Sequence, residues 1–439
     1  MGQTIAIDVH HMTRVEGHGN IHVNVKDGVV ERCEWQVPEA PRFFEAMVRG
    51  RHYSEVSRIV SRICGICAIG HSLASVKAIE SALGIEISPQ TRKLRTLLKH
   101  AENVDSHVLH VYVLVAPDLL GASSAFALLP THGEVVARAL RLKRLAHEWG
   151  SMIGGRTTHP TTVVPGGFSK LPTVAELTAM RDKIIAAVPD IEATVETVAA
   201  LAAGIPAFDR PTEYMAVTSD SEYGLYDGYV QTILPNGDRA VYDVANYRDC
   251  TNEYVSPNST SKYARNRLDS YAAGALARFN VNYDQLRPEA KAVAERLGLA
   301  PICTNPYMNS VAQVVEVVHS AYEGLRLIDE LIAEGIVDEA PAQPQKTSGT
   351  GATALEVPRG ILFHEYTFDD EGLCVGANCI IPTGQNHANI QADFDALLPW
   401  LMEQNKTEDE IRLAFEMLVR AYDPCISCST HYLDVEFVG

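Results

Sequence analysis

The chain has 439 residues, of which 46% are apolar, and a formal charge of -18 at pH 7. This length and apolar content are sufficient to bury a large core, as two or three domains or as one multi-lobed unit. The negative charge argues against nucleic acid or an anionic membrane surface as the main partner, because both would repel the chain at long range.

No targeting or membrane segment is visible in the sequence. The first residues lack the basic and apolar stretches of a secretory signal, and no apolar run approaches the roughly 20 residues that a membrane span requires. Nine cysteines are too few and too unevenly spaced for a disulfide framework in a chain of this length. We therefore expect a cytoplasmic protein without a membrane span, whose cysteines serve metal binding or catalysis.

The N-terminal half predicts a short β element followed by long helices. Apolar and polar residues alternate over residues 21–25, before an Asp-Gly turn, which predicts a hairpin. Helical spacing of apolar residues then predicts a long buried helix over residues 88–117, beginning at a Ser-Pro pair. Further helices are expected over residues 134–153 and 174–203, where glycines end both patterns.

The C-terminal half mixes strands and helices. Tyr, Val and Thr are frequent between residues 212 and 249, around an Asn-Gly turn, which predicts a second small sheet. Pro, Gln, Ser, Gly and Thr dominate residues 341–353, which we interpret as a surface loop. The remaining pattern predicts two helices, a hairpin and two more helices, over residues 284–298, 307–334, 361–381, 389–404 and 407–421.

These elements predict an α+β fold that is predominantly helical, with a central bundle of long helices and small peripheral β-sheets. We interpret residues 1–439 as one multi-lobed domain. Its expected parts are an N-terminal β element, a helical bundle, an inserted β and loop region, a further helical part, and a C-terminal part with a hairpin and helices, at residues 1–50, 51–205, 206–283, 284–340 and 354–439.

Two Cys-x-x-Cys pairs lie near opposite ends of the chain, Cys64 with Cys67 and Cys425 with Cys428. Four thiolates make a soft metal site, and their spacing alone leaves zinc, nickel and iron-sulfur open. Structural zinc usually closes a compact local loop. Here the two pairs lie near opposite ends of the chain, so the whole fold must form before they meet, at a cost in loop-closure entropy. The known spacings of iron-sulfur clusters place at least three cysteines close together, which disfavours a cluster.

The residues around the two pairs carry more information than the spacing. Residues 62–71 and 423–431 resemble the two metal-binding signatures of nickel-iron hydrogenase large subunits, and they occur in the same order. The resemblance extends over nearly the whole chain. Further matching segments are residues 13–18, 106–118, 154–160, 274–278, 358–360 and 382–383.

The resemblance implies the large-subunit fold and a binuclear metal centre. It implies that Cys64, Cys67, Cys425 and Cys428 bind nickel, and that Cys67 and Cys428 also bridge to an iron that carries carbon monoxide and cyanide. Thiolates are strong donors that make nickel redox-active and can accept a proton, which suits the splitting of H2. The resemblance makes Cys425 the first proton acceptor.

Glu16 matches the family's candidate for a proton relay from that cysteine. A carboxylate within hydrogen-bond reach of a thiol can move a proton by small rotations when burial raises its pKa. Without the resemblance, Glu16 in Glu-Gly-His would be interpreted as an ordinary turn or capping carboxylate.

The resemblance also implies a magnesium ion near the C-terminus. Glu45 matches its carboxylate ligand, and the other protein ligands would be the His431 side chain and the backbone carbonyl of Cys379. Oxygen ligands suit magnesium, whereas histidine is a less typical ligand of so hard an ion. The alternative for Glu45 is a solvated helix face.

Four more residues match positions around the iron. The resemblance implies that Arg359 and Thr383 donate hydrogen bonds to the cyanides, and that Pro382 belongs to the same apolar wall. Anionic ligands would compensate the charge of a buried guanidinium. His71 is expected to donate to a bridging sulfur. The alternatives are a surface salt bridge or turn for the first three and a packed core histidine for His71.

The remaining cysteines show no cluster spacing, and we expect most of them to be buried small apolar residues: Cys33, Cys250, Cys303, Cys374 and Cys379. The chain therefore lacks its own electron relay. The resemblance implies an iron-sulfur small subunit, docked where residues 154–159 and the N-terminal signature face it, together with further flavin or iron-sulfur subunits. It also implies a maturation endopeptidase that cleaves after His431, before residues 432–439.

The predicted function is reversible oxidation of H2 by the catalytic large subunit of a cytoplasmic nickel-iron hydrogenase. The absence of a signal and a span, and the segment Gly-Ala-Leu-Ala-Arg, resemble the soluble cofactor-coupled group. Electrons would pass to NAD(P), a deazaflavin, a heterodisulfide or a bifurcating flavin. One alternative is an H2 sensor with the same centre. The other is a metal-free structural subunit like that of respiratory complex I, which the four retained cysteines disfavour.

Overall fold

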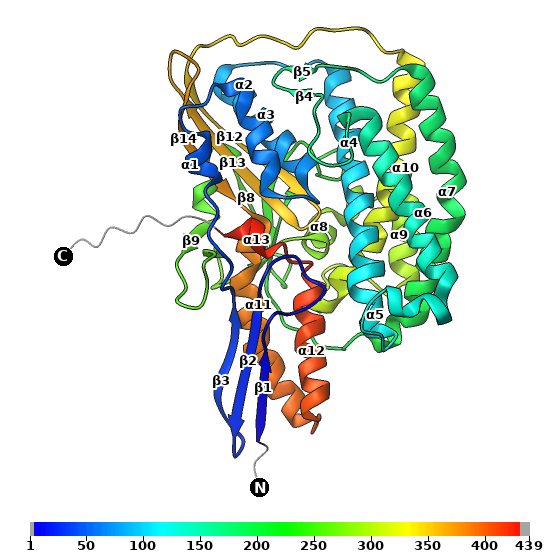
Figure 1. The fold of residues 1–439 in the computed structure, drawn as a ribbon, viewed down its shortest axis with the longest axis vertical. Helices are drawn as coiled ribbons and strands as arrows, with labels where there is room; N and C mark the ends of the chain where they lie inside the picture. The colour runs from blue at the N-terminus through cyan, green and yellow to red at the C-terminus, as the bar shows by residue number, and fades with distance from the viewer. Residues whose placement is uncertain (1–3, 431–439) are drawn as a thin grey trace, which may run out of the picture.

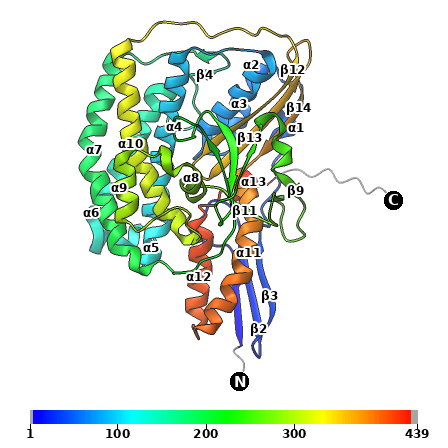
Figure 2. The same ribbon diagram turned by 180° about the vertical axis from the view of Figure 1, so that it is seen from behind.

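The computed structural model describes residues 4–430. Long helices dominate it, and small β-sheets lie beside and below them, which confirms the predicted fold class (Figure 1). Seen from behind, the bundle of long helices lies on one side and the sheets on the other, with the C-terminal helices between them (Figure 2). Within residues 4–430, no helix is both long enough and apolar enough to cross a membrane.

The predicted N-terminal hairpin is confirmed and belongs to a three-stranded antiparallel sheet. The strands are β1 (Ile5–Val9), β2 (Asn20–Lys26) and β3 (Val29–Gln36), in that order. Asp27 and Gly28 both have positive φ, as a two-residue turn between twisted strands requires. Trp35 of β3 is fully buried, and its indole N–H donates to His387 Nδ1 at 3.1 Å.

The predicted long helices are also confirmed. They are α4 (Pro89–Leu109), α6 (Leu129–Gly154), α7 (Val174–Leu201) and α10 (Asn309–Glu334). Their ends follow the expected chemistry: Ser88 caps α4 through Thr91 N–H, Thr173 and Glu176 form a capping box on α7, and Gly155 ends α6 with a left-handed backbone.

The helix predicted over residues 88–117 is interrupted. A π-helical turn at His110–Val115 follows α4, and α5 (Ala116–Leu119) follows the turn. Such turns are often found beside functional sites because they redirect side chains. Here the turn begins at His110, a buried residue whose Nε2 contacts the carbonyl of Arg420 at 2.6 Å.

Shorter helices, for which the sequence analysis assigned no separate boundaries, place the first cysteine pair and the central region. They are α1 (Phe44–Val48), α2 (Tyr53–Val60), α3 (Ala68–Leu83) and α8 (Ala275–Asn282). The helix expected over residues 284–298 is α9 (Pro288–Arg296).

The expected second sheet is present and has four strands in the order β11-β6-β7-β8. Its strands are β6 (Glu213–Thr218), β7 (Tyr229–Ile233), β8 (Arg239–Tyr242) and β11 (Tyr271–Ala272). Two small hairpins lie elsewhere, formed by β4 (Val163–Val164) with β5 (Gly167–Phe168) and by β9 (Asn252–Tyr254) with β10 (Tyr263–Arg265).

The C-terminal hairpin is confirmed as β13 (Gly360–Phe368) and β14 (Cys374–Ile380), but a third strand joins it. The loop predicted at residues 341–353 is wrong from residue 349 onward, because β12 (Gly349–Val357) begins there. Gly351 lies against the backbone of α3, where an added Cβ would meet Ala82 N at 2.2 Å. The small residues therefore permit close packing and do not mark a loop.

The last three helices lead the chain back to the centre of the molecule. Helix α11 (Pro382–Glu403) starts earlier than predicted, because its first turns bury polar side chains and carry no apolar periodicity. Helix α12 (Glu408–Ala421) matches its prediction, and α13 (Ile426–Ser429) carries the second cysteine pair into the interior (Figure 1).

Candidate metal centre

The two cysteine pairs meet in the interior. Cys64 follows the turn after α2, and Cys67 occupies the N-cap position of α3. Cys425 occupies the N-cap position of α13, and Cys428 lies within that helix. All four are buried. The sulfurs of Cys64, Cys425 and Cys428 all lie within 4.8 Å of one another, and the Sγ atoms of Cys64 and Cys425 are 3.7 Å apart.

Cys425 and Cys428 form a disulfide in the structure. Only the thiolate form binds a metal, so the reduced pair is the form that could serve as ligands. The separation between Cys64 and Cys425 leaves their sulfurs close enough to share one ion after reduction.

Cys67 does not belong to this group of three sulfurs, although the prediction placed all four cysteines on one metal. Its backbone N–H donates to Cys64 Sγ at 3.0 Å. Burial raises the pKa of Cys64, but the hydrogen bond from Cys67 and the positive charge of Arg359 outweigh burial, so the pKa falls below its usual value. The hydrogen bond with Cys64 and burial raise the pKa of Cys67. The pair therefore favours one thiolate, the form that binds metal.

Arg359 is close enough to Cys64 and Cys67 for its charge to act on both thiols. Its Nε donates to the carbonyl of Asp423 at 2.6 Å, and Nη2 donates to Asp423 Oδ1 at 2.7 Å. Its Nη1 is buried and has no hydrogen-bond partner among residues 4–430. Burial alone would lower its pKa, but Asp423, Cys67 and Cys64 raise it, so the guanidinium stays charged. A buried, unpartnered donor on a cation fits an anionic group in front of it.

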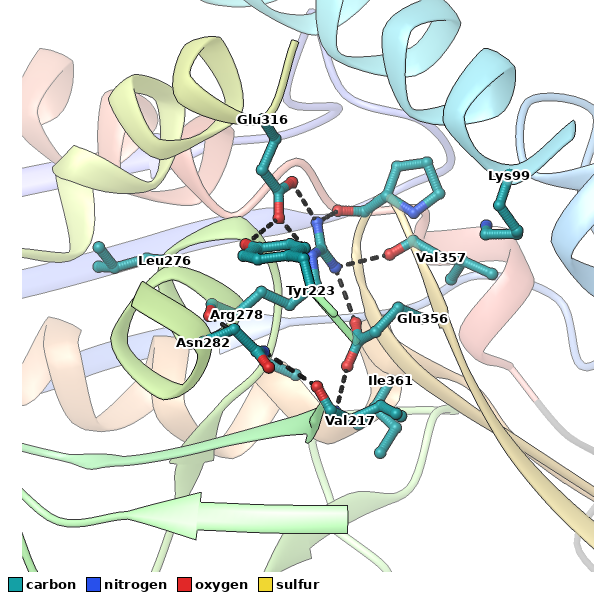
Figure 3. Close-up of polar contacts among 12 residues, drawn as sticks. Lys99, Val217, Tyr223, Leu276, Arg278, Asn282, Glu316, Glu356, Val357 and Ile361 are labelled. Carbon is teal, nitrogen blue, oxygen red and sulfur yellow. Dashed lines mark hydrogen bonds and ion pairs between the residues drawn. The ribbon is translucent and has the colours of Figure 1, made fainter. Parts of the chain in front are cut away.

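A buried ion network holds the backbone before Arg359 (Figure 3). Arg278 of α8 donates from Nε and Nη2 to both oxygens of Glu316, at 2.6 and 2.7 Å. Its Nη1 reaches Glu356 Oε2 at 2.8 Å, and Nη1 and Nη2 reach the carbonyls of Val357 and Pro358 at 2.8 and 2.9 Å. All five N–H groups of the guanidinium are thus used.

The pKa values of the two carboxylates in this network shift in opposite directions. Burial raises the pKa of Glu356 to about 7, although Arg278 and the Val217 N–H oppose the shift. For Glu316, Arg278 and His107 outweigh burial and lower the pKa below its usual range. Glu316 is therefore the permanent counter-ion of Arg278, and the network avoids two uncompensated buried charges.

Thr383 and Pro382 lie at the start of α11, beside the second cysteine pair. Pro382 occupies the first turn of the helix, where its missing N–H leaves no donor unsatisfied. Thr383 is buried, and its Oγ1 accepts the backbone N–H of Cys425 at 3.0 Å. The hydroxyl therefore faces the cysteine segment, as the predicted site requires.

Glu16 reaches the same segment from the N-terminal end of the chain. It forms a parallel β-bridge with Cys425, and its carbonyl accepts the Ile426 N–H at 2.9 Å. Its carboxylate accepts the Ser427 N–H at 3.1 Å and the Ser427 hydroxyl. The residue is half-buried. The structure therefore brings Glu16 beside the second pair, with Ser427 as its direct partner.

His71 is buried on α3 but bonds to another histidine. Its Nδ1 lies 3.2 Å from His364 Nε2, and its Nε2 is buried without a hydrogen-bond partner among residues 4–430. No hydrogen bond joins the ring to a cysteine sulfur in that part of the chain. Burial, then His364, Arg42 and Lys99, lower its pKa, so the ring is neutral and can donate from one nitrogen.

Two of the three residues expected to bind magnesium, Glu45 and Cys379, are in contact. Glu45 lies in the first turn of α1, and its Oε1 accepts the backbone N–H of Cys379 at 2.7 Å. The predicted ligand was the carbonyl of Cys379, and the contact seen here uses its amide. His431 and the tail at residues 432–439 lie outside the described residues.

The other cysteines match the expectation of mostly buried residues. Cys250, Cys374 and Cys379 are buried, whereas Cys33 and Cys303 are partly exposed. None of them belongs to a group of metal-ligating side chains within residues 4–430.

The sequence analysis missed the partners that hold Arg359. Asp423 appears there only as part of a signature, yet it accepts two hydrogen bonds from Arg359 and one from Gln313 Nε2 at 3.1 Å. A buried arginine needs a carboxylate partner, and Asp423 is the acidic residue of that signature. The pairing of Arg359 with Asp423 could therefore have been predicted from the sequence. Nothing in the spacing of Arg278, Glu316 and Glu356 marks them as one network.

The donor set as a whole fits a nickel-iron centre. Cysteine sulfurs supply soft ligands, the surroundings are buried, and Nη1 of Arg359 is a buried donor without a partner among residues 4–430.

The model of the nickel-dependent hydrogenase family matches residues 42–138 and 214–431, and a model described as HoxL-like matches residues 6–40. The alpha subunit of sulfhydrogenase 2 from Pyrococcus furiosus is 32% identical over 433 residues, which cover 97% of this chain and 99% of that protein. The corresponding chain of the F420-non-reducing hydrogenase from Methanothermobacter thermautotrophicus is 29% identical, over 98% of this chain and 95% of that protein.

Among solved structures, an NAD+-reducing [NiFe]-hydrogenase in the H2-reduced state is 28% identical and has a TM-score of 0.86, covering 97% of this chain and 99% of that one. The [NiFeSe]-hydrogenase of Dm. baculatum, 21% identical with a TM-score of 0.76, shares the fold. This chain belongs to the nickel-dependent hydrogenase family and has its large-subunit fold. It is an oxidoreductase that acts on H2, and the zinc and metal-free alternatives are set aside.

Proposed function

We propose that this chain is the catalytic large subunit of a hydrogenase that interconverts H2 with protons and electrons, and that its four paired cysteines hold the metals. The observation that carries the proposal is the approach of Cys64, Cys425 and Cys428 to within 4.8 Å in a buried site, where the charge of Arg359 acts on Cys64 and Nη1 of Arg359 is unpartnered among residues 4–430. A purely structural thiolate site would have no use for an unpartnered buried guanidinium donor.

In this proposal Cys64, Cys67, Cys425 and Cys428 would hold nickel, and Cys67 and Cys428 would also hold an iron that carries carbon monoxide and cyanide. The centre supplies the redox chemistry that splits H2 when it is bound. Arg359 Nη1 and the Thr383 hydroxyl donate to the cyanides, and Pro382 keeps water from that side. The hydrogen bonds of Arg359 to Asp423 and of Thr383 to the Cys425 N–H support these roles, because both tie these residues to the segment of the second pair.

Protons leave through the chain's own residues. Cys425 takes the proton first, and Glu16 carries it onward. The backbone bridge between these two residues supports this order, because it fixes the carboxylate beside the segment that carries the thiol. Ser427, whose hydroxyl contacts Glu16, is placed to hold the carboxylate in that position.

Two further roles follow from the family. The neutral ring of His71 donates from Nε2 to a bridging sulfur, a role supported by the absence of another partner for that atom in residues 4–430. A magnesium ion is held by Glu45, the carbonyl of Cys379 and His431, and the closeness of Glu45 to Cys379 supports it. Processing by an endopeptidase after His431 belongs to the same proposal.

Electrons leave through a partner. The relatives are named as subunits of sulfhydrogenases and F420-non-reducing hydrogenases, which supports assembly with a small iron-sulfur subunit, together with further electron-transfer subunits. Beyond that small partner we propose a soluble acceptor: NAD(P), a deazaflavin, a heterodisulfide or a bifurcating flavin.

The infrared spectrum of the purified complex tests the proposal, because metal-bound carbon monoxide and cyanide absorb where proteins do not. We expect their bands, nickel and iron by elemental analysis, and H2-dependent reduction of an artificial acceptor. Zinc without these bands would overturn the nickel-iron assignment. The bands without turnover would indicate an H2 sensor.

A further inference from the structure

Three side chains that can ligate a metal converge on the N-terminal sheet, and they form a group separate from the paired cysteines. Asp8 lies on β1, His10 follows that strand, and His22 lies on β2. Asp8 Oδ2 is 3.0 Å from His10 Nε2, and Asp8 Oδ1 contacts His22 Nδ1. One ligand atom from each residue lies within 4.8 Å of the other two.

The backbone dictates this convergence. Asp8 and His22 are direct partners in the antiparallel ladder between β1 and β2, so their side chains stand on the same face of the sheet. His10 is two residues beyond Asp8, which returns its side chain to that face. The two imidazole rings are 5.4 Å apart between centroids and nearly perpendicular, so neither ring covers the other's nitrogen.

We propose that Asp8, His10 and His22 form a binding site for a divalent cation of the borderline class, represented by Zn2+. Two imidazoles and one carboxylate suit Zn2+ and disfavour Mg2+ and Ca2+, which take oxygen ligands. Ligand atoms around a tetrahedral ion lie roughly 3.4 Å apart at the usual bond lengths. One donor atom of each residue already lies within 4.8 Å of the other two, so small side-chain movements separate the present arrangement from that spacing.

The electrostatic surroundings permit a cation. Arg32 lies beside Asp8 and His22 along the same open depression, but its guanidinium is paired with Glu34 Oε2 at 2.8 Å. Glu34 is also the ladder partner of His22, on β3. The charges of this pair cancel, so the carboxylate of Asp8 remains to attract the ion.

The site lies at the root of the loop that carries Glu16. His11 N–H donates to Asn20 Oδ1 at 3.2 Å, and Met12 N–H donates to the Gly19 carbonyl at 3.1 Å, which close the loop at its base. A cation bound by residues of β1, of β2 and of the position after β1 adds a third interaction, besides these two hydrogen bonds, at the base of the loop. The site itself stands whether or not Glu16 relays protons.

Calorimetric titration of the metal-loaded complex with Zn2+ alone tests the site. We expect one additional Zn2+ per chain, at least tenfold weaker binding in His10→Ala and in Asp8→Asn, and no comparable binding of Mg2+. His10 is 62% exposed, so its removal leaves the sheet intact. His147→Ala is the matched control, because His147 is also partly exposed and paired with one aspartate, Asp105, without a second histidine in the group.

A second measurement reports on the loop. Zn2+ should slow amide hydrogen exchange over residues 11–19 in the wild type and in His147→Ala, and leave it unchanged in His10→Ala. Equal Zn2+ stoichiometry and affinity in wild type and His10→Ala, or equal binding of Mg2+, would overturn the site. Neither result touches the infrared test of the nickel-iron centre, so the two proposals fail separately.

Discussion

Arg359 uses its donors unequally, and this defines what the site can accept. Nε and Nη2 are held by the backbone and carboxylate of Asp423, which fixes the plane of the guanidinium. The guanidinium is a rigid plane, so fixing Nε and Nη2 also fixes the direction of the Nη1 N–H groups. A lysine in the same place would keep the charge but lose this direction.

The thiol of Cys425 should be indispensable for metal binding. Cys425→Ser exchanges a soft sulfur for a hard hydroxyl of similar size, so we expect a folded chain that loses nickel and H2 uptake by at least a hundredfold. Metal analysis and thermal unfolding of the same preparation measure both. Cys303→Ser, at a partly exposed cysteine outside the site, should change neither. Normal nickel content in Cys425→Ser would contradict the ligand assignment.

Glu16→Gln separates proton transfer from metal binding. The amide keeps an oxygen for the Ser427 N–H but cannot carry a proton at neutral pH, so nickel content should stay normal while H2/D2 exchange with solvent falls at least tenfold. Glu31→Gln, on the exposed face of β3, is the control. Exchange at the wild-type rate in Glu16→Gln would eliminate this relay.

At the scale of elements, helix α8 connects α10 to the strand β12 through the ion pairs of Arg278. Arg278 binds Glu316 of the one and Glu356 of the other, and it also binds the two carbonyls that precede Arg359 (Figure 3). The position of the active-site arginine therefore depends on a helix that contributes no ligand.

Arg278→Met should be among the most damaging substitutions in the chain. It leaves Glu316 charged in a dry interior, which typically costs about 3–5 kcal/mol. We expect a loss of that size in chemical denaturation, and shifted cyanide bands in any folded complex. Arg248→Met removes an exposed ion pair with Glu365 and should cost less than about 1 kcal/mol. Similar losses in both variants would contradict the network's role.

The sequence predicts elements whose signal is local. Helices α4, α7 and α12 have caps that are readable as Ser88, Thr173 and Thr407, and apolar stripes set their lengths. It fails where tertiary packing decides. The sequence of β12 resembles a loop because it contains Gly351, which must lie against α3. The start of α11 cannot be recognised from apolar periodicity, because its first turns bury amides and a histidine.

The candidate site divides in the same way. The cysteines and Glu16 carry motifs, so they could be named from the sequence and resemblance. The pairing of Arg359 with Asp423, and of Arg278 with Glu316 and Glu356, depends on long-range contacts between helices and strands that no spacing encodes.

Across the whole molecule, the site is closed by the two ends of the chain. The loop between β1 and β2 contacts the segment before and within α13: Glu16 N–H donates to the Pro424 carbonyl, and Arg420 Nε donates to the Thr13 carbonyl at 3.1 Å. The same segment brings Cys425 Sγ to 3.7 Å from Cys64 Sγ. Metal retention should therefore depend on residues of the loop that touch no metal.

Gly17 offers the sharpest test of that dependence. It has φ +84°, and an added Cβ would lie 2.6 Å from Ser427 N and 2.8 Å from Ile426 Cβ. Gly17→Ala should push α13 away from the loop, so we expect at least a tenfold drop in nickel per chain in elemental analysis, with the circular dichroism of the helices retained.

Gly50→Ala is the matched control, because Gly50 has a similar φ of +75° but no atom of residues 4–430 lies within 4 Å of the added Cβ. Both variants bear the strain of a left-handed alanine, about 1–2 kcal/mol. Only Gly17→Ala meets the C-terminal segment. Equal nickel content in the two variants would mean that strain alone governs the outcome, and that closure between the ends of the chain does not control metal retention.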